Sequence, residues 1–212
     1  PDNAGVRVQL GFLYLQGGAR ATARAQLDSA LMLDPNHPQA HKLFGLWLTQ
    51  AQQIDSAIVV YQHVVELQPD DVEAHNNVAF LLAGKARYAE ALEWYKKTKL
   101  LSSDPQLLHA VNLNMEGIRA IMAGKMRARY ILVETQASCE QVAAKAAAGE
   151  DFGELAAQFS IAPNAAEGGD LGFFGPGDMV TAVEEAVLGL GVGEVSAVIP
   201  IGRHFMLLER LN

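Results

Sequence analysis

The sequence predicts a two-part protein in which an all-α array of helical repeats is followed by a small α+β domain. Between about residues 4 and 105, apolar and small residues recur with a period of 34 residues, which is typical of stacked helical hairpins. From residue 127 onward, short apolar runs alternate with helical stretches and glycine-rich turns, as in a mixed α and β domain. We expect the array to cover residues 1–126 and the second domain to cover residues 127–212.

Composition and charge narrow the class of protein. Half of the 212 residues are hydrophobic and 19% are charged, which indicates a packed core rather than disorder. The net charge is −8 and the basic residues are scattered, so we expect no nucleic-acid partner. No apolar run reaches the roughly 20 residues that cross a bilayer, so no membrane span is expected. The chain begins with Pro1 rather than Met, from which we expect a further segment upstream.

Equivalent positions of the repeats carry the same kind of residue. One helix face carries Leu10, Phe44 and Val78. Small residues, which let a second helix approach closely, stand at Gly11, Gly45, Ala79, Ala23, Ala57 and Ala91. Prolines end the hairpins because they disfavour helix in the preceding residue; they are Pro35, Pro69 and, two residues late, Pro105. A hairpin cannot bury its apolar face alone, so the repeats must stack into a solenoid.

These residues resemble the tetratricopeptide repeat (TPR) over about residues 4–105. The following stretch, residues 106–125, is expected to form the first helix of an incomplete fourth repeat and to cap the array. The resemblance implies a concave groove, lined by the first helix of each hairpin, that holds a protein partner. Its candidate residues are Val8, Phe12, Leu15, Gln16, Lys42, Leu46, Gln50, Asn76 and Phe80.

The groove differs from a family pattern in one respect. Some members clamp a chain-terminal carboxylate with a Lys/Asn set, but Val8 and Phe12 occupy two of its places here. The alternative is that the candidate groove residues are merely exposed array surface or pack on the second domain.

The second domain is predicted to begin with a strand at 130–133 and two helices at 139–148 and 151–160. A strand at 171–174, a helix at 181–190 and strands at 195–201 and 204–211 are predicted to follow. Asp151 suits the start of its helix. The stretch from Gly168 to Met179 has five glycines in its first ten residues, with Phe173 and Phe174 among them. Since glycine permits positive φ and close backbone approach, we expect a tight path with apolar anchors.

This βααβαββ order, with a four-stranded, mostly antiparallel sheet, resembles the parvulin, or rotamase, family of peptidyl-prolyl cis-trans isomerases. The residues that carry the resemblance are ARYILV at 128–133, GEDF at 149–152, LA at 155–156, FS at 159–160, GGDLG at 168–172, FGPG at 174–177, MV at 179–180, GEVS at 193–196 and GRH at 202–204. They span about residues 127–212.

The resemblance implies a pocket with catalytic positions at His204, Tyr130 and Met179. It implies substrate-binding positions at Met179, Val183, Ile201, Phe174 and Ala162. Tyr130 stands in the place of a histidine, Ala162 in that of a cysteine or aspartate, and Val183 and Ile201 in those of two phenylalanines. The alternatives are a core histidine at His204 that is satisfied by Tyr130, and simple core packing for Met179 and Phe174.

The function expected from these features is a peptidyl-prolyl isomerase, or foldase, that acts on protein clients containing X-Pro bonds recruited by the groove. The alternative is a weak or inactive parvulin-like chaperone or scaffold that binds extended peptides. Amide rotation needs no covalent chemistry, and we expect no cofactor and no metal, since His37 and His41 lack a third ligand. By analogy, the resemblance implies the bacterial periplasm or cell envelope, with the cytoplasm as the alternative.

Overall fold

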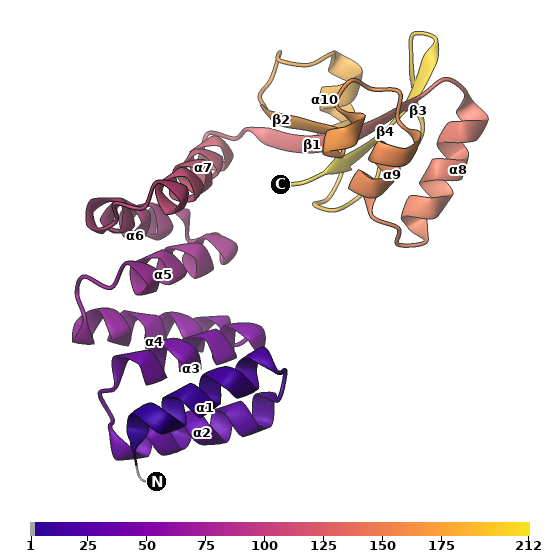
Figure 1. Ribbon diagram of the computed structural model, residues 1–212. Coiled ribbons are helices and arrows are strands. Elements are labelled where there is room, and N and C mark those ends of the chain that lie inside the picture. The colour runs from indigo at the N-terminus through magenta and orange to yellow at the C-terminus, as the bar shows by residue number, and fades with distance from the viewer. Residues whose placement is uncertain (1–2) are drawn as a thin grey trace. The chain divides into compact units, whose positions relative to one another are not determined.

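The computed structural model describes residues 3–212 and divides into two compact units, one ending at Ile118 and the other beginning at Arg119 (Figure 1). The division falls within helix α7 (Pro105–Met122), upstream of the boundary at residue 126 expected from the sequence. Among the residues described, no helix has both the length and the apolar character that crossing a membrane requires.

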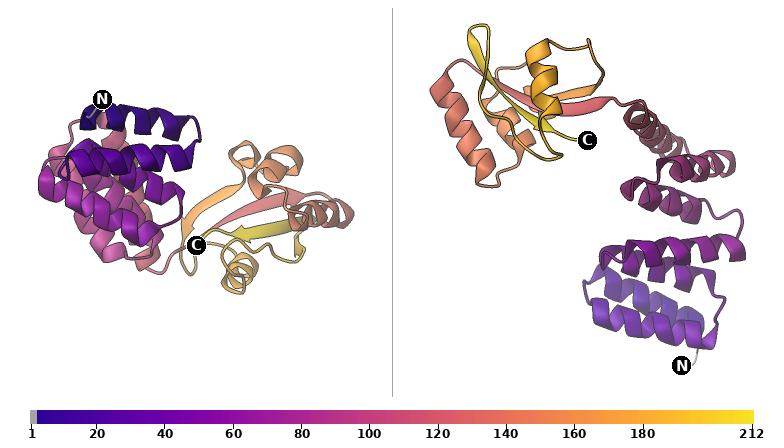
Figure 2. Two further views of the ribbon diagram at one scale, coloured as in Figure 1. Left: turned by 90° about the horizontal axis from the view of Figure 1, so that it is seen from below. Right: turned by 180° about the vertical axis from the view of Figure 1, so that it is seen from behind.

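Three helical hairpins form the first unit, and their period confirms the repeat prediction. Each hairpin begins 34 residues after the previous one. The pairs are α1 (Ala4–Gln16) with α2 (Arg20–Leu33), α3 (Pro38–Gln50) with α4 (Ile54–Leu67), and α5 (Val72–Gly84) with α6 (Tyr88–Leu101). Helix α7 follows as the first helix of a fourth repeat and has no partner helix among the described residues, and the hairpins stack on one another (Figure 2).

Close packing within two hairpins depends on the glycines identified in the sequence. A Cβ atom added at Gly45 would lie 2.8 Å from the ring of Tyr61, and one added at Gly11 would lie 2.8 Å from the side chain of Leu27. Real Cβ atoms do not approach neighbours this closely, so only glycine lets the paired helices come together here without a shift.

The turn between the two helices of each hairpin uses a left-handed residue. Gly18, Gln52 and Ala86, at equivalent repeat positions, have φ of 73°, 59° and 57°. Because an L-residue is strained in this conformation, we expect Ala86→Gly to stabilise the array by about 0.5 kcal/mol, after the entropy that glycine adds to the unfolded chain. Urea unfolding checks this; Ala83→Gly, inside α5, should instead cost about 1 kcal/mol.

The second unit is a four-stranded antiparallel sheet with strand order β2-β1-β4-β3. Its strands are β1 (Met126–Val133), β2 (Asp170–Phe174), β3 (Ile199–Ile201) and β4 (His204–Arg210). Its helices are α8 (Gln136–Ala147), α9 (Phe152–Phe159), the 3-10 turn η1 (Ala165–Glu167) and α10 (Thr181–Leu188). The Asp151 side chain caps α9 by accepting a hydrogen bond from the Glu154 N–H at 2.9 Å. The predicted βααβαββ order is confirmed.

Helices cover both faces of this sheet (Figures 1 and 2). Ile131 and Leu207 point to one face, where they pack in a cluster with residues of α8 and α9. Ala128, Met206 and Leu208 alternate with them and pack on the other face with α10. We call this second side the α10 face. The core of this face contains five of the parvulin-like positions, Tyr130, Phe174, Met179, Val183 and Ile201.

The third strand is shorter than the predicted run over residues 195–201. Val195 forms only an isolated bridge to Glu209. The Ser196 hydroxyl oxygen accepts a hydrogen bond from the Leu208 N–H at 3.0 Å. The Ser196 side chain therefore binds a β4 N–H group that would have paired with a backbone carbonyl if β3 were continuous. Regular pairing of β3 with β4 begins only at Ile199.

Candidate functional site

The glycine-rich path that precedes β2 is locked against β1. Gly169 has φ of 73°, and its carbonyl oxygen accepts a hydrogen bond from the Tyr130 N–H at 2.9 Å. A side chain at Gly169 would overlap the Tyr130 carbonyl oxygen. Gly169 in turn donates its N–H to the Asn164 carbonyl oxygen at 3.0 Å. The path therefore fixes the backbone of Tyr130, the first of the parvulin-like positions.

Four predicted site residues lie on the α10 face. Tyr130 pairs with Leu208, and Ile201 pairs with His204 at the start of β4. Since alternate strand residues share a face, Tyr130 and His204 lie on the same side of the sheet as Leu208. Tyr130, Met179 and Ile201 are partly buried against the core of this face. The face therefore combines half-exposed apolar side chains with a histidine at one end.

Tyr130 and His204 do not form the pair considered from the sequence. The partner of Tyr130 on β4 lies four residues from His204, which corresponds to roughly 13 Å along a strand. Within residues 3–212, the structure contains no side-chain hydrogen bond from the Tyr130 hydroxyl or the His204 ring. The alternative of a core histidine satisfied by Tyr130 is therefore wrong.

Three other predicted pocket residues are buried. Phe174, Val183 and Ala162 are 1%, 4% and 6% exposed. Phe174 and Val183 belong to the core beneath α10. Burial of this extent favours packing over direct contact with a ligand, so the contact surface we propose below comprises Tyr130, Met179, Ile201 and His204.

Ser160, which the sequence indicated only as part of the parvulin resemblance and not as a site residue, holds the loop that contains Ala162. The Ser160 hydroxyl oxygen accepts hydrogen bonds from the N–H groups of Leu132 and Ala162, at 3.1 and 3.2 Å. The Ile161 N–H donates to the Leu132 carbonyl oxygen at 2.8 Å. This loop is thereby attached to β1.

Glu184 is a second residue that the sequence reasoning missed. Its carboxylate accepts hydrogen bonds from the N–H groups of Gly177 and Met179, at 2.8 and 3.0 Å. The acidic residue on the first turn of α10 thus orients the loop that carries Met179. An acidic residue in the first turn of a helix that follows a glycine-rich loop is the signal that could have identified it.

Two arginines of β1 lie beside carboxylates whose pKa values are shifted in opposite directions. Burial raises the pKa of Asp170, but hydrogen bonds from Arg127 and the Gly172 N–H outweigh it and leave that pKa below its usual value. Burial raises the pKa of Glu209, whose nearest Arg129 nitrogen is 3.8 Å away. One carboxylate is therefore stabilised in its charged form, while the other is not.

These shifts predict opposite effects of neutral substitutions. Asp170 contributes stability that is present above its unfolded pKa and lost as pH falls through its lower folded pKa. We expect Asp170→Asn to destabilise the second unit by about 1 kcal/mol at pH 7, with the deficit shrinking in acid. Glu209→Gln is expected to be neutral or stabilising at pH 7, because the charged form is disfavoured in the folded state. Thermal unfolding between about pH 3 and pH 7 measures both; the same sign for both variants at pH 7 would contradict this account.

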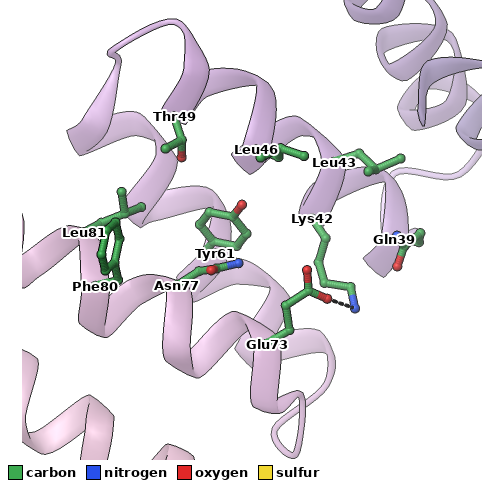
Figure 3. A pocket seen from close by; sticks show the side chains of 10 residues that line it. All are labelled: Gln39, Lys42, Leu43, Leu46, Thr49, Tyr61, Glu73, Asn77, Phe80 and Leu81. Carbon is green, nitrogen blue, oxygen red and sulfur yellow. Dashed lines mark hydrogen bonds and ion pairs between the residues drawn. The ribbon is translucent and has the colours of Figure 1, made fainter. Parts of the chain in front are cut away.

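In the first unit, three predicted groove residues line one hollow. Lys42, Leu46 and Phe80 lie around a hollow of about 250 Å³ above the ring of Tyr61 (Figure 3). Asn76 lines a neighbouring hollow of about 480 Å³. Phe12 lines neither hollow but is exposed on α1. The polar residues that line the first hollow from α5 are Glu73 and Asn77.

Two of the residues predicted to line the groove, Val8 and Leu15, do not line it. Val8 and Leu15 are buried, at 2% and 7% exposure. They pack in one cluster with Leu27 of the paired helix and Leu43 of α3. Helix α1 therefore turns these side chains into the array, where they cannot contact a partner.

Lys42 is held by two carboxylates. Its Nζ lies 3.0 Å from oxygens of both Asp71 and Glu73. Burial lowers the pKa of Lys42, but the hydrogen bonds and charges of Asp71 and Glu73 outweigh it and raise that pKa overall. The Asp71 side chain also caps α5 by accepting from the Ala74 N–H at 2.8 Å. The positive charge of Lys42 is thus already neutralised.

The two histidines near the start of α3 have local roles. The His37 ring accepts a hydrogen bond from the Ala40 N–H at 3.4 Å, and the His41 ring lies 2.8 Å from the Pro35 carbonyl oxygen. Across residues 3–212, no three His, Cys, Asp or Glu side chains are grouped so that they could hold a metal ion.

Comparison with known proteins agrees with both halves of this description. Residues 129–210 match the family model of the PPIC-type PPIase domain, or rotamase. The chain is 44% identical over 87 residues to the foldase protein PrsA of Halalkalibacterium halodurans, a match that covers 40% of this chain and 26% of PrsA. The chain thus spans about a quarter of the length of the curated relatives it matches, since 26% of each of three is covered.

Two solved structures share the fold of the array. The first TPR of Spaghetti (RPAP3), bound to an HSP90 peptide, has a TM-score of 0.52 at 16% identity, with 57% of this chain and 93% of that chain covered. The Yersinia enterocolitica type III secretion chaperone SycD, in complex with a peptide of the translocator YopD, has a TM-score of 0.51 at 20% identity, with 54% and 91% covered. At this level of identity the likeness concerns the fold alone. Residues 129–210 are therefore similar to the PPIC-type PPIase, or rotamase, domain, and the array that precedes them has the fold of the TPR structures.

Proposed function

We propose that the chain is a foldase whose C-terminal domain isomerises X-Pro bonds of protein clients, and whose repeat array recruits those clients. The observation that carries this proposal is the α10 face, where Met179 and Ile201 are only partly buried and Ile201 pairs with His204. Support also comes from the match of residues 129–210 to the PPIC-type PPIase domain and from the foldase name of the matched relatives.

Catalysis of this rotation requires that the protein bind the twisted amide more tightly than the planar cis or trans amide. Rotation about an X-Pro bond is opposed by a barrier of about 20 kcal/mol, most of it from amide resonance. Met179 and Ile201 offer apolar surface for the proline ring, and packing there removes water from the amide. Tyr130 supplies a hydroxyl and His204 supplies ring nitrogens, and either of these groups can hydrogen-bond an amide that lies near it on this face. None of these roles requires a covalent intermediate.

The refolding of a client protein tests this function. The substrate is a denatured protein whose slow refolding phase is limited by prolyl isomerisation. We expect the rate of that phase to rise in proportion to the concentration of the chain. Met179→Ala should reduce the acceleration about tenfold, since it removes a side chain of the contact surface. Val180→Ala, at a neighbouring position that is 62% exposed, should not. No acceleration at equimolar concentration would reject the proposal.

A second function is favoured by the separation of Tyr130 from His204, since Tyr130 of β1 pairs with Leu208, four residues from His204 on β4. A face without a paired polar group can bind an extended apolar segment and leave its amide planar. The chain would then be a chaperone or scaffold that protects clients without isomerising them. That function predicts suppressed client aggregation with an unchanged slow refolding phase, so the same experiment separates the two.

The cellular location of the protein is also a proposal. The matched foldases come from bacteria, and the resemblance of the whole arrangement to folding factors of the envelope favours the bacterial periplasm or cell envelope. Fractionation of cells that express the natural protein, followed by immunodetection, checks it; recovery only with cytoplasmic proteins would contradict it.

A further inference from the structure

We propose that the repeat array binds an extended segment of a partner protein in which a lysine or arginine stands between large apolar side chains. This inference deepens the proposed function, because it names the chemistry of the segment that the array recruits. The surface is the pair of neighbouring hollows described above, which share Glu73. We call this surface the array groove.

The charge of the array groove is negative. Lys42 is the cation of the first hollow, and it lies at 3.0 Å from both Asp71 and Glu73. Two carboxylates thus face one ammonium group. The second hollow adds Asp104 and no cation. The excess of carboxylates favours a cationic segment.

The exposure of these side chains shows which carboxylate is available. The Asp71 side chain is 9% exposed and is occupied as the cap of α5. The Glu73 side chain is 65% exposed, so one of its oxygens can accept hydrogen bonds from an incoming ammonium or guanidinium group. Its charge also reaches the floor of the hollow: after burial, Glu73 is the second cause that raises the pKa of Tyr61 to about 12.

Apolar side chains flank this charge on both sides. Leu46 and Phe80 are 37% and 60% exposed at the first hollow, and Leu101 is 39% exposed at the second. Figure 3 shows Phe80 toward one end of the first hollow and the Lys42–Glu73 pair toward the other. A segment with a basic residue between apolar ones would therefore place its charge near Glu73 and its apolar side chains on either side.

A segment that ends in a carboxylate fits this groove poorly. Its terminal charge would have to approach Lys42, where Asp71 and Glu73 already occupy the ammonium group. Displacing them would leave Asp71, which is mostly buried, without its ionic partner.

Fluorescence anisotropy with the full chain tests the proposal. The probe is the fluorescein-labelled, C-amidated peptide GSLFKLFSG, and the comparison peptide has glutamate in place of lysine. We expect the lysine peptide to bind about three- to fivefold more tightly at low salt, which is the range expected for one exposed charge pair. The preference should shrink when salt screens the pair.

Substitutions locate the binding site. Glu73→Gln should weaken the lysine peptide about threefold and tighten the glutamate peptide, since it leaves Lys42 less neutralised. Phe80→Ala should weaken both peptides about tenfold. The control Glu66→Gln, on α4 with its side chain 75% exposed, should change neither. Equal affinity for the two peptides, or binding of the lysine peptide that neither Glu73→Gln nor Phe80→Ala alters, would overturn the proposal.

The outcome is separable from that of the isomerase proposal. Both peptides lack an X-Pro bond, so neither is a substrate of the isomerase, and the effects of Glu73→Gln and Phe80→Ala report on the array groove alone. Failure of the client refolding test leaves these affinities unchanged, and failure of the peptide test leaves any catalysis of refolding in place.

Discussion

Gly169→Ala is expected to unfold the C-terminal unit and to leave the repeat array folded. The added methyl group would overlap the carbonyl oxygen of Tyr130, a backbone atom of the central strand β1. Gly169 also has φ of 73°, where an L-residue is strained. Relief requires the breaking of the hydrogen bond between the Tyr130 N–H and the Gly169 carbonyl oxygen. We expect a loss of more than about 4 kcal/mol, which is comparable with the stability of a small domain.

Hydrogen exchange measured by mass spectrometry resolves this effect along the chain. In Gly169→Ala, protection should be lost over residues 127–212 and retained over the array. Gly172→Ala is the matched control, because Gly172 has a similar φ of 69° but no atom within 4 Å of an added Cβ. It should cost only about 1–2 kcal/mol. Equal losses in the two variants would show that the contact with β1 contributes nothing.

Phe174→Ala is expected to have the second large effect, because Phe174 is a core residue. It is 1% exposed and packs with Met126, Val187 and Leu208. Truncation of a buried phenylalanine removes apolar contacts and leaves a cavity, at a cost of about 3–5 kcal/mol. Chemical denaturation that monitors the second unit measures this cost. A loss below about 1 kcal/mol, the value typical of a surface position, would contradict the core assignment.

Phe174→Leu separates a packing role from a role in substrate contact. It keeps most of the apolar volume, so the unit should remain folded with a modest loss of stability. If Phe174 acts only in the core, the acceleration of client refolding per folded molecule should match that of the unsubstituted chain. A large fall in acceleration by a folded Phe174→Leu variant would place the ring in the contact surface.

The architecture could be predicted from the sequence wherever a local pattern determines the structure. The period of 34 residues placed all three hairpins, and Gly11 and Gly45 identified the close helix crossings. The turns at Gln52 and Ala86 could not be predicted, since only Gly18 of the three equivalent positions is a residue that favours positive φ. Stacking of the repeats imposes that conformation on the other two.

The functional surfaces were less predictable because they depend on contacts between distant residues. Lys42 was correctly placed at a hollow, but its neutralisation by Asp71 and Glu73, about one repeat later, has no local signal. The same is true of Glu184, whose hold on Met179 requires the loop to fold back on α10. Sequence position suggested that Phe174, Val183 and Ala162 bind substrate, whereas burial separates them from Met179 and Ile201.

Exchange NMR of a short peptide that contains an Ala-Pro bond tests the central claim most directly, because it detects bond rotation without client folding. The uncatalysed exchange takes tens of seconds at 25 °C. The α10 face is predicted to bring cis–trans exchange into the range of about one second or less when the chain is present, and Met179→Ala should slow it. Exchange that stays at the rate in buffer, with a folded chain at the concentration of the peptide, would contradict the claim that this domain is an isomerase.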